Sequence, residues 1–186
     1  MRVTGGAARG RRLNAPPGIR PTSDRVREAI FNVLDAQEAD YSRVLDLYAG
    51  SGLLGIEALS RGEGWCDFVE RSAAAANVIK DNLALAGLAE HGRVHRFAAE
   101  HAAGRLAGPY SLLLADPPYD DDSALAALAR IAASDLLGPD ATLVLEHSSR
   151  RDPPEKLGGL QLSWTRRYGD TQVSIYRGSQ REEGIR

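Results

Sequence analysis

The sequence predicts an α/β fold: a single domain in which a mostly parallel sheet carries helices on both faces. Segments typical of strands and helices alternate along the chain, which is the pattern of such folds. Several expected strands, 111–115 among them, are continuous apolar runs, as in strands buried on both faces. A length of 186 residues with 43% apolar content suits one domain with its own core.

The expected elements follow from residue patterns in chain order. The first 20 residues are rich in glycine and proline and predict an extended arm or a short hairpin. Thr22 or Ser23 then caps a helix with an apolar stripe that runs to about Ala39. Later helices are expected at 53–61, at 73–86 before Gly87, and at 123–137 before Gly138-Pro139. Strands are expected at 44–48, 66–70, 93–97, 111–115 and 142–146, with a closing hairpin at 160–165 and 171–176.

Charge is distributed unevenly along the chain. The net charge is −2, but residues 1–30 hold seven arginines against Asp24 and Glu28, a net of +5, so the rest carries −7. A basic arm on an acidic body predicts a polyanionic partner bound through one end, because guanidinium groups match phosphate oxygens. The alternative is a solvated basic tail. We divide the chain into an arm (1–21), a folded domain (22–180) and a frayed tail (181–186).

The composition argues against several classes of protein. The longest apolar runs are far too short to span a membrane, and no apolar segment suits a signal peptide. The single cysteine, Cys66, rules out an internal disulfide and is expected as a small buried strand residue. His91, His95 and His101 lack the spacing of metal ligands. We therefore expect a cytoplasmic protein without a bound metal.

A glycine-rich turn follows the first expected strand. Within 46–55, Gly50 and Gly52 permit a tight turn close to a ligand, and Gly55 lets the next helix approach the strand. Glu70, at the end of the second strand, supplies a carboxylate for ribose hydroxyls. The pattern fits a dinucleotide or S-adenosylmethionine.

Asp46 helps to separate these two cofactors. It lies inside the strand, four residues before the first glycine of the turn. A pyrophosphate gains nothing from a carboxylate there, whereas a sulfonium ligand with a free ammonium group does. The structural alternative is that Asp46 pins the loop by accepting its backbone amides. We expect both roles to hold in part.

The strongest catalytic motif is Asp116-Pro117-Pro118-Tyr119, directly after the apolar strand 111–115. An exocyclic amine is a poor nucleophile because its lone pair is delocalised into the ring. A carboxylate and a carbonyl that accept both amine protons would turn the lone pair toward a methyl donor. Asp116 supplies the carboxylate, the prolines stiffen the loop, and Tyr119 offers a face on which a flipped base can stack. A rigid loop without catalytic function is the alternative.

In these motifs the chain resembles the bacterial family called RsmD, which methylates the N2 amine of a guanine in small-subunit (16S) ribosomal RNA. The most specific match is the segment 20–28, Arg-Pro-Thr-Ser-Asp-Arg-Val-Arg-Glu. The glycine loop and Asp-Pro-Pro-Tyr are shared by many amino-methyltransferases. The remaining matches lie at 5–6, 9–13, 29–32, 55–62, 68–70 and 114–115.

The resemblance implies a single-domain, Rossmann-like class I methyltransferase with a seven-stranded sheet that ends in an antiparallel hairpin. It implies S-adenosylmethionine as methyl donor and 16S RNA within an assembling 30S subunit as partner. The expected cofactor-binding residues are Asp46, Tyr48, Ala49, Gly50, Gly52, Glu70 and Ala99. The expected RNA-binding residues are Arg9, Arg11, Arg12, Arg20, Thr22, Arg25 and Arg27.

One position departs from the family. After the third strand, members carry a polar side chain toward the adenine amino group, whereas this chain has Ala98-Ala99. Backbone amides near Ala99, or the side chain of Glu100, are then left to hold the adenine. Three alternatives stay open for the whole chain: a methyltransferase that acts on adenine or cytosine in DNA, a nicotinamide-dependent enzyme, and a non-enzymatic RNA-binding module.

Overall fold

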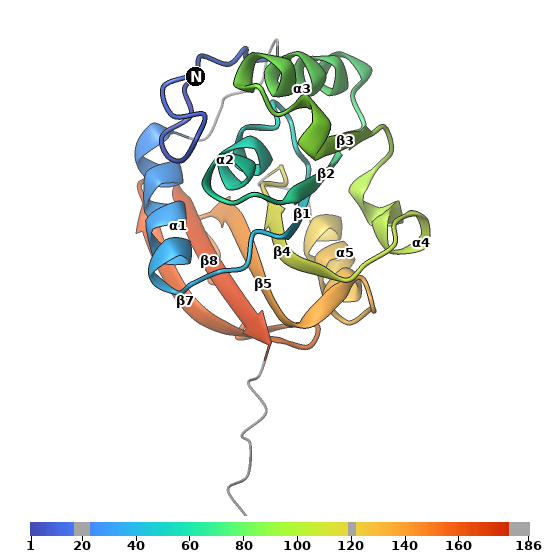
Figure 1. Cartoon of the computed structure of the whole chain (residues 1–186). Helices are drawn as coiled ribbons and strands as arrows, with labels where there is room; N and C mark the ends of the chain where they lie inside the picture. Colours follow the sequence, from blue (N-terminus) through green and yellow to red (C-terminus); the bar gives the residue numbers. More distant parts are fainter. Residues whose placement is uncertain (17–22, 119–121, 179–186) are drawn as a thin grey trace, which may run out of the picture.

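The computed structural model describes residues 1–16, 23–118 and 122–178 and contains one eight-stranded sheet (Figure 1). The strands are β1 (Arg43–Leu47), β2 (Trp65–Val69), β3 (Gly92–His95), β4 (Tyr110–Ala115), β5 (Leu137–Ser148), β6 (Lys156–Leu157), β7 (Leu160–Tyr168) and β8 (Thr171–Gly178). They are arranged in the order β3-β2-β1-β4-β5-β8-β7-β6. The first five strands are parallel, and β8, β7 and β6 are antiparallel.

The predicted mostly parallel sheet with a closing antiparallel hairpin is confirmed. Seven strands were expected, and the eighth is the two-residue strand β6, which pairs with the start of β7. So short a strand carries no alternating pattern that a sequence could reveal.

The helices are α1 (Asp24–Ala36), α2 (Leu53–Arg61), α3 (Ala73–Ala86), α4 (Ala102–Arg105) and α5 (Asp122–Ala132). Two short 3-10 turns, Ala89–His91 and Ala99–His101, join them. The hydroxyl of Ser23 accepts the amide of Val26 at 3.3 Å and caps α1, and Gly87 ends α3 in the left-handed conformation with φ 74°. The capping predictions at both places are confirmed.

Two predicted helix ends were wrong. The first helix stops at Ala36 rather than near Ala39. The helix expected to reach Leu137 stops at Ala132, and β5 begins at Leu137, which pairs with Tyr110. The amide of Tyr110 donates to the carbonyl of Leu136 at 2.8 Å, so bonds to β4 override local helix propensity. Pro139 lies in β5 beside a register shift, where a missing amide is tolerated.

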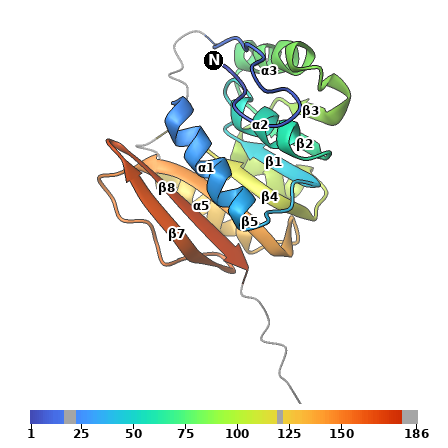
Figure 2. The ribbon, with the colours of Figure 1, turned by 60° about the vertical axis from the view of Figure 1, so that its left-hand side comes forward.

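The sheet buries one apolar cluster on each face. Helices α1, α2 and α3 pack on one face, over strand residues such as Val44, Phe68 and Leu112. The helices α4 and α5 cover the other face, over residues such as Leu45 and Leu113. Figure 2 shows α1 and α2 in front of the sheet and α5 behind it. Successive strand residues alternate between the two clusters, which explains why the strands read as continuous apolar runs.

Cys66 is a fully buried, free cysteine in β2, as expected, and burial raises the pKa of its thiol. Among the residues that the structure describes, no helix is long and apolar enough to cross a membrane.

Candidate active site

The carboxyl ends of the central strands meet at one edge of the sheet. Leu47, the last residue of β1, pairs with Val69 of β2 on one side and with Ala115 of β4 on the other. The residues that follow these strand ends, Tyr48, Glu70 and Asp116, therefore leave the sheet together at this edge. We call it the carboxyl edge. In doubly covered parallel sheets, this is where ligands bind.

The loop from β1 to α2 turns sharply. Gly50 and Gly52 adopt left-handed backbone angles, φ 55° and φ 75°, so the prediction of a tight glycine turn is confirmed. Tyr48 also has positive φ, 57°, a conformation uncommon for a side chain of its size. The amide of Ala49 donates to the carbonyl of Val69 at 3.1 Å, which ties the loop to β2.

Gly55 lets α2 lie close to the sheet, as predicted. A Cβ atom on Gly55 would stand 2.4 Å from the ring of Phe68 and 2.8 Å from the sulfur of Cys66. Neither neighbour can yield, because both are fully buried in β2. The position therefore requires glycine for packing between helix and strand.

Asp46 lies beneath the loop, with only 1% of its surface exposed. Its Oδ2 accepts the amide of Gly55 at 2.9 Å, within the first turn of α2. Burial is the main cause that raises its pKa to about 8, with a smaller contribution from the charge of Glu70, and the Gly55 amide opposes the rise. The pinning role is thus present, although the bond is to the helix start rather than to the loop itself. A contact with a cofactor stays a prediction.

Glu70 stands at the end of β2, with 9% of its surface exposed. Its Oε2 accepts the amide of Gly50 at 3.0 Å, and its Oε1 accepts the amide of Ser72 at 2.7 Å. The carboxylate therefore joins the glycine loop to the start of α3. Each oxygen keeps a further lone pair for a ligand hydroxyl.

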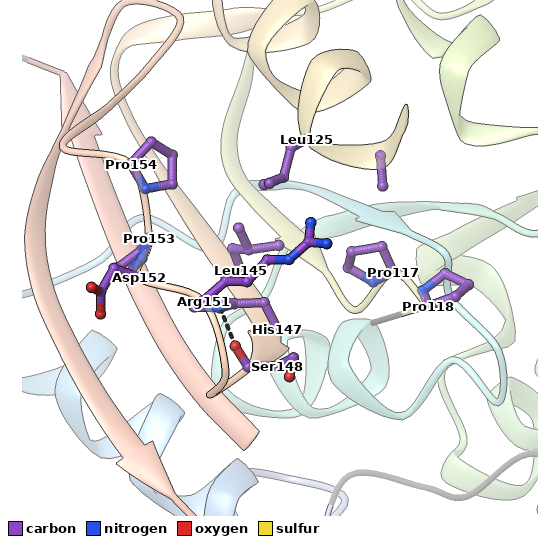
Figure 3. A pocket seen from close by; sticks show the side chains of 11 residues that line it. Pro117, Pro118, Leu125, Leu145, His147, Ser148, Arg151, Asp152, Pro153 and Pro154 are labelled. Carbon is purple, nitrogen blue, oxygen red and sulfur yellow. Dashed lines mark hydrogen bonds between the residues drawn. The ribbon is translucent and has the colours of Figure 1, made fainter. Parts of the chain in front are cut away.

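The Asp-Pro-Pro loop leaves β4 beside this site. Asp116 is half-buried, Pro117 is buried and Pro118 is exposed. Tyr119, the fourth residue of the predicted catalytic motif, lies outside the described residues, as do Arg20 and Thr22 of the predicted RNA-binding set. A cavity of about 50 Å³ opens next to the two prolines (Figure 3). It is far smaller than a nucleotide site, which spans roughly 300–1,000 Å³.

The far wall of this cavity was not predicted from the sequence. It consists of Leu125 from α5, the end of β5 and the segment 151–154 that follows β5. His147 of β5 contacts the hydroxyl of Ser174 at 2.8 Å through Nε2, and burial lowers its pKa, which favours the neutral ring. One signal could have pointed to this wall: residues 152–154 repeat the motif Asp-Pro-Pro.

Ala99 lies in the 3-10 turn after β3 and is buried, next to half-buried Glu100. Its methyl group packs in the apolar cluster that holds Val69. The predicted adenine contact by a backbone amide or by Glu100 stays a prediction.

The first 13 residues form a small hairpin, which is one of the two alternatives that the sequence left open for residues 1–20. Arg2 and Arg12 make an antiparallel bridge, and the amide of Val3 donates to the carbonyl of Arg11 at 3.1 Å. Three apolar side chains, those of Val3, Ala8 and Leu13, are buried against the domain. We call residues 1–13 the N-terminal hairpin.

The hairpin is fastened to α2 and α3. Glu57 of α2 accepts the amides of Thr4 and Gly5 at 2.8 and 2.7 Å. Asn82 of α3 is fully buried, and its Nδ2 donates at 2.9 Å to the carbonyls of both Asn14 and Ser51. One side chain thus joins Asn14, the residue after the hairpin, to the glycine loop.

The arginines of the arm fall into two groups. Arg9, Arg11 and Arg12 are exposed on the N-terminal hairpin, and Arg25 is exposed on α1. Arg27 is fully buried, with its Nε 3.3 Å from Oε2 of Glu57. The expectation that Arg27 contacts RNA was wrong, because its guanidinium is enclosed and neutralised inside the protein.

Comparisons with known proteins agree with this fold. The family model described as "Conserved hypothetical protein 95" matches residues 1–177. "Putative rRNA methyltransferase YlbH" of Bacillus subtilis is 41% identical over 182 residues, which cover 95% of this chain and 98% of the relative. The "Ribosomal RNA small subunit methyltransferase D" of Escherichia coli is 40% identical over 121 residues, 64% of this chain and 60% of that protein. A solved structure, "Putative methyltransferase yhhF from Escherichia coli", superposes with a TM-score of 0.85 at 30% identity, covering 97% and 99% of the two chains.

The family match covers nearly the whole chain and includes the N-terminal hairpin, the glycine loop and the Asp-Pro-Pro loop. The family and enzyme class expected from the sequence are confirmed. The chain belongs to the RsmD-like family of methyltransferases.

Proposed function

We propose that this methyltransferase transfers a methyl group from S-adenosylmethionine to the exocyclic N2 amine of a guanine in small-subunit (16S) ribosomal RNA. One observation carries the proposal: a glycine loop with an acidic partner and an Asp-Pro-Pro loop leave adjacent strands at the same edge of the sheet. A cofactor held by the first loop and an amine held by the second would therefore lie side by side.

The residues of the first loop suit S-adenosylmethionine. Gly50 and Gly52 keep side chains away from the turn, and Glu70 offers a nearly buried carboxylate for ribose hydroxyls. Tyr48 and Ala49 complete the loop. We assign to the cofactor site also the backbone near Ala99, in the 3-10 turn that follows β3. The bound cofactor supplies an electrophilic methyl group on a sulfonium. Burial raises the pKa of Asp46, below the loop, to about 8, and a cationic ligand bound beside it would favour the ionised carboxylate.

The second loop prepares the amine. Asp116 accepts one amine proton, and a carbonyl of the stiff proline pair accepts the other, so that the nitrogen lone pair turns toward the methyl donor. No base has to remove the proton beforehand, because the nitrogen becomes acidic only after it has been methylated. We assign Tyr119 the stacking face for the base.

The substrate assignment rests on the basic arm and on the relatives. Exposed arginines at 9, 11, 12 and 25 are available to bind phosphates, and Asn14, just after the hairpin, is joined through Asn82 to Ser51 of the glycine loop. Two relatives have names that describe action on ribosomal RNA, and one of these names specifies the small subunit. We therefore propose 16S RNA as the partner, presented within an assembling 30S particle.

The decisive experiment is mass mapping of methylated guanines in 16S RNA from cells with and without the gene. One N2-methylguanine should disappear without the gene and return with the intact gene. In vitro, the purified protein should methylate small-subunit particles far better than duplex DNA. A preference for duplex DNA would indicate a DNA amino-methyltransferase instead of a ribosomal one. Unchanged guanine methylation in the deletion strain would show that 16S RNA guanine is not the substrate.

A further inference from the structure

Four exposed arginines from two segments lie near the carboxyl edge beyond the catalytic loop. Arg150 and Arg151 follow β5, and Arg166 and Arg167 lie near the end of β7. Because β8 runs antiparallel to β5, with Ser148 opposite Thr171, the turn between β7 and β8 also lies at this edge. We call these four residues the arginine cluster. Fourteen residues separate Arg151 from Arg166 in the sequence, which gives no sign that the two segments lie close together.

Specific bonds hold the two segments together. The amide of Ser149 donates to the carbonyl of Asp170, and its hydroxyl donates to the carbonyl of Gly169, each at 2.9 Å. The Nε of Arg167 donates to the same Gly169 carbonyl at 2.8 Å. The guanidinium carbon of Arg166 lies 5.5 Å from the ring centre of Tyr168. The backbone that carries the cluster is therefore ordered, which lowers the entropy cost when a ligand binds.

One member of the cluster, Arg151, adjoins the proposed base site directly. Arg151 lines the cavity beside Pro117 and Pro118, and Figure 3 shows its side chain extending toward Pro117. In the order of the strands, the catalytic loop after β4 lies between the N-terminal hairpin on the β1 side and the cluster on the β5–β8 side. A nucleic acid that contacts both would pass across the catalytic loop.

Charge identifies the kind of partner. Residues 149–152 and 166–170 hold four arginines against Asp152 and Asp170, a net of +2 in a chain whose net charge is −2. All four cations are arginine, whose planar fork binds phosphate through two bonds and also stacks on bases. Elsewhere on β7, the residues Gln161, Ser163 and Thr165 carry no charge, so the positive charge is confined to the end near the catalytic loop.

We propose that the arginine cluster is a second RNA-contact surface that holds phosphates flanking the target nucleotide. The proposal rests on the proposed function. It adds that the RNA is held from both sides of the catalytic loop, so that the flipped base is positioned by two phosphate contacts rather than by the N-terminal hairpin alone.

The test compares two double variants, Arg150→Gln with Arg151→Gln and Arg166→Gln with Arg167→Gln. Binding of naked small-subunit RNA is measured over a range of salt concentrations. We expect weaker binding, with the log–log salt slope reduced by about 0.7–0.9 for each phosphate that the variant no longer binds. Methylation of small-subunit particles should show a raised KM, while calorimetric affinity for S-adenosylmethionine stays unchanged.

The matched control replaces Arg93 and Arg130, which are exposed on β3 and near the end of α5, with glutamine. It removes the same charge away from the edge and should keep the parent slope. Thermal melting of every variant shows whether the β7–β8 turn has stayed folded. If the log–log salt slope of RNA binding is the same for both cluster variants as for the control variant, the proposal is wrong.

Two further outcomes separate this inference from its premise. If particle methylation disappears while the slope on naked RNA is unchanged, the cluster contacts a protein of the particle, and the RNA proposal is wrong. If the parent protein methylates no particle but its RNA binding depends on the cluster, the proposed function fails while the contact surface stands.

Discussion

Arg27 and Glu57 form an ion pair inside the protein: Nε lies 3.3 Å from Oε2, and both side chains are fully buried. Arg27 also donates to Asp24 at 2.9 Å and to the carbonyl of Arg2. Glu57 in turn accepts the hydroxyl of Thr4 at 2.7 Å. One buried pair thus joins α1, α2 and the N-terminal hairpin, so an arginine of the most family-specific segment serves the fold.

Replacing Arg27 with glutamine should therefore cost stability rather than RNA affinity. Removing one partner of a buried pair costs about 3–5 kcal/mol when the other charge is left uncompensated. Arg61, whose guanidinium lies 3.0 Å from Oε1 of Glu57, still compensates part of the charge, so we expect the loss to lie near the lower end of this range. The control is Arg25→Gln on the exposed side of the same helix, expected to stay within about 0.5 kcal/mol. Urea unfolding measures both. Equal stabilities of the two variants would contradict the structural role of Arg27.

Glu70→Ala should weaken S-adenosylmethionine binding by about 1.5–3 kcal/mol, the scale of a hydrogen bond to a charged group. The variant also removes the acceptor for the amides of Gly50 and Ser72, so part of the effect comes from a looser glycine loop. Glu70→Gln keeps one acceptor oxygen, so its affinity for S-adenosylmethionine should lie between that of the parent protein and that of Glu70→Ala. Exposed Glu90→Ala serves as the calorimetric control, and affinity unchanged by Glu70→Ala would remove this residue from the site.

Local patterns predicted the elements of this fold well, and tertiary pairings limited the prediction elsewhere. The glycine loop, the Ser23 cap and the Gly87 helix end each depend on one backbone conformation that a residue type reveals. The end of α5 depends instead on where β4 bonds to Leu136 and Leu137, which no local pattern records.

The same division holds for the site. The carboxyl-edge residues could be predicted because parallel strands place their ends together. The burial of Arg27 depends on a partner 30 residues away, so its sequence neighbours made it look like one more exposed arginine. The cavity wall near His147 was missed because it forms only when the segment after β5 folds back beside the Asp-Pro-Pro loop.

Asp46 should make stability depend on pH. Its pKa of about 8 in the folded protein lies above the ordinary value of 3.8, so the folded state holds a proton that the unfolded state releases. The free energy of unfolding should then decrease as the pH rises from about 4 to about 8. Asp46→Asn removes this titration and retains an oxygen for the amide of Gly55. Urea unfolding at several pH values should show a flatter profile for the variant, and parallel profiles would assign the dependence to other groups.

Asp116→Ala should abolish methyl transfer while cofactor binding survives, because Asp116 is proposed to act on the amine alone. Single-turnover transfer to small-subunit particles measures the first effect, and calorimetry measures the second. Asp140→Ala, at an exposed position near the opposite end of β5, is the control for the removal of one carboxylate. Near-normal single-turnover transfer by Asp116→Ala would exclude the proposed orientation of the amine.

The last prediction concerns the exposed arginines of the N-terminal hairpin. Arg9, Arg11 and Arg12 project from a hairpin whose docking depends on buried apolar residues and on Glu57, so replacing all three with glutamine should leave the fold intact. RNA binding should weaken, and its log–log salt slope should fall by about 0.7–0.9 for each phosphate that these arginines bind in the parent protein.

The matched control for the hairpin variant replaces three exposed cations away from the carboxyl edge, Arg93, Arg130 and Lys156. It removes the same charge and should keep the parent slope, which separates specific contacts from a general change in net charge. Affinity for S-adenosylmethionine should be equal in both variants, because the substituted side chains are exposed and the bonds of Asn82 to Asn14 and the glycine loop are kept. A short RNA hairpin should be methylated poorly by the parent protein, since contacts on both sides of the site need a structured RNA to span them. Two results together would contradict this prediction: the short RNA hairpin is methylated as well as the small-subunit particle, and the triple-arginine variant binds RNA like the control variant. The basic arm would then be a solvated tail, and RNA recognition would lie elsewhere on the molecule.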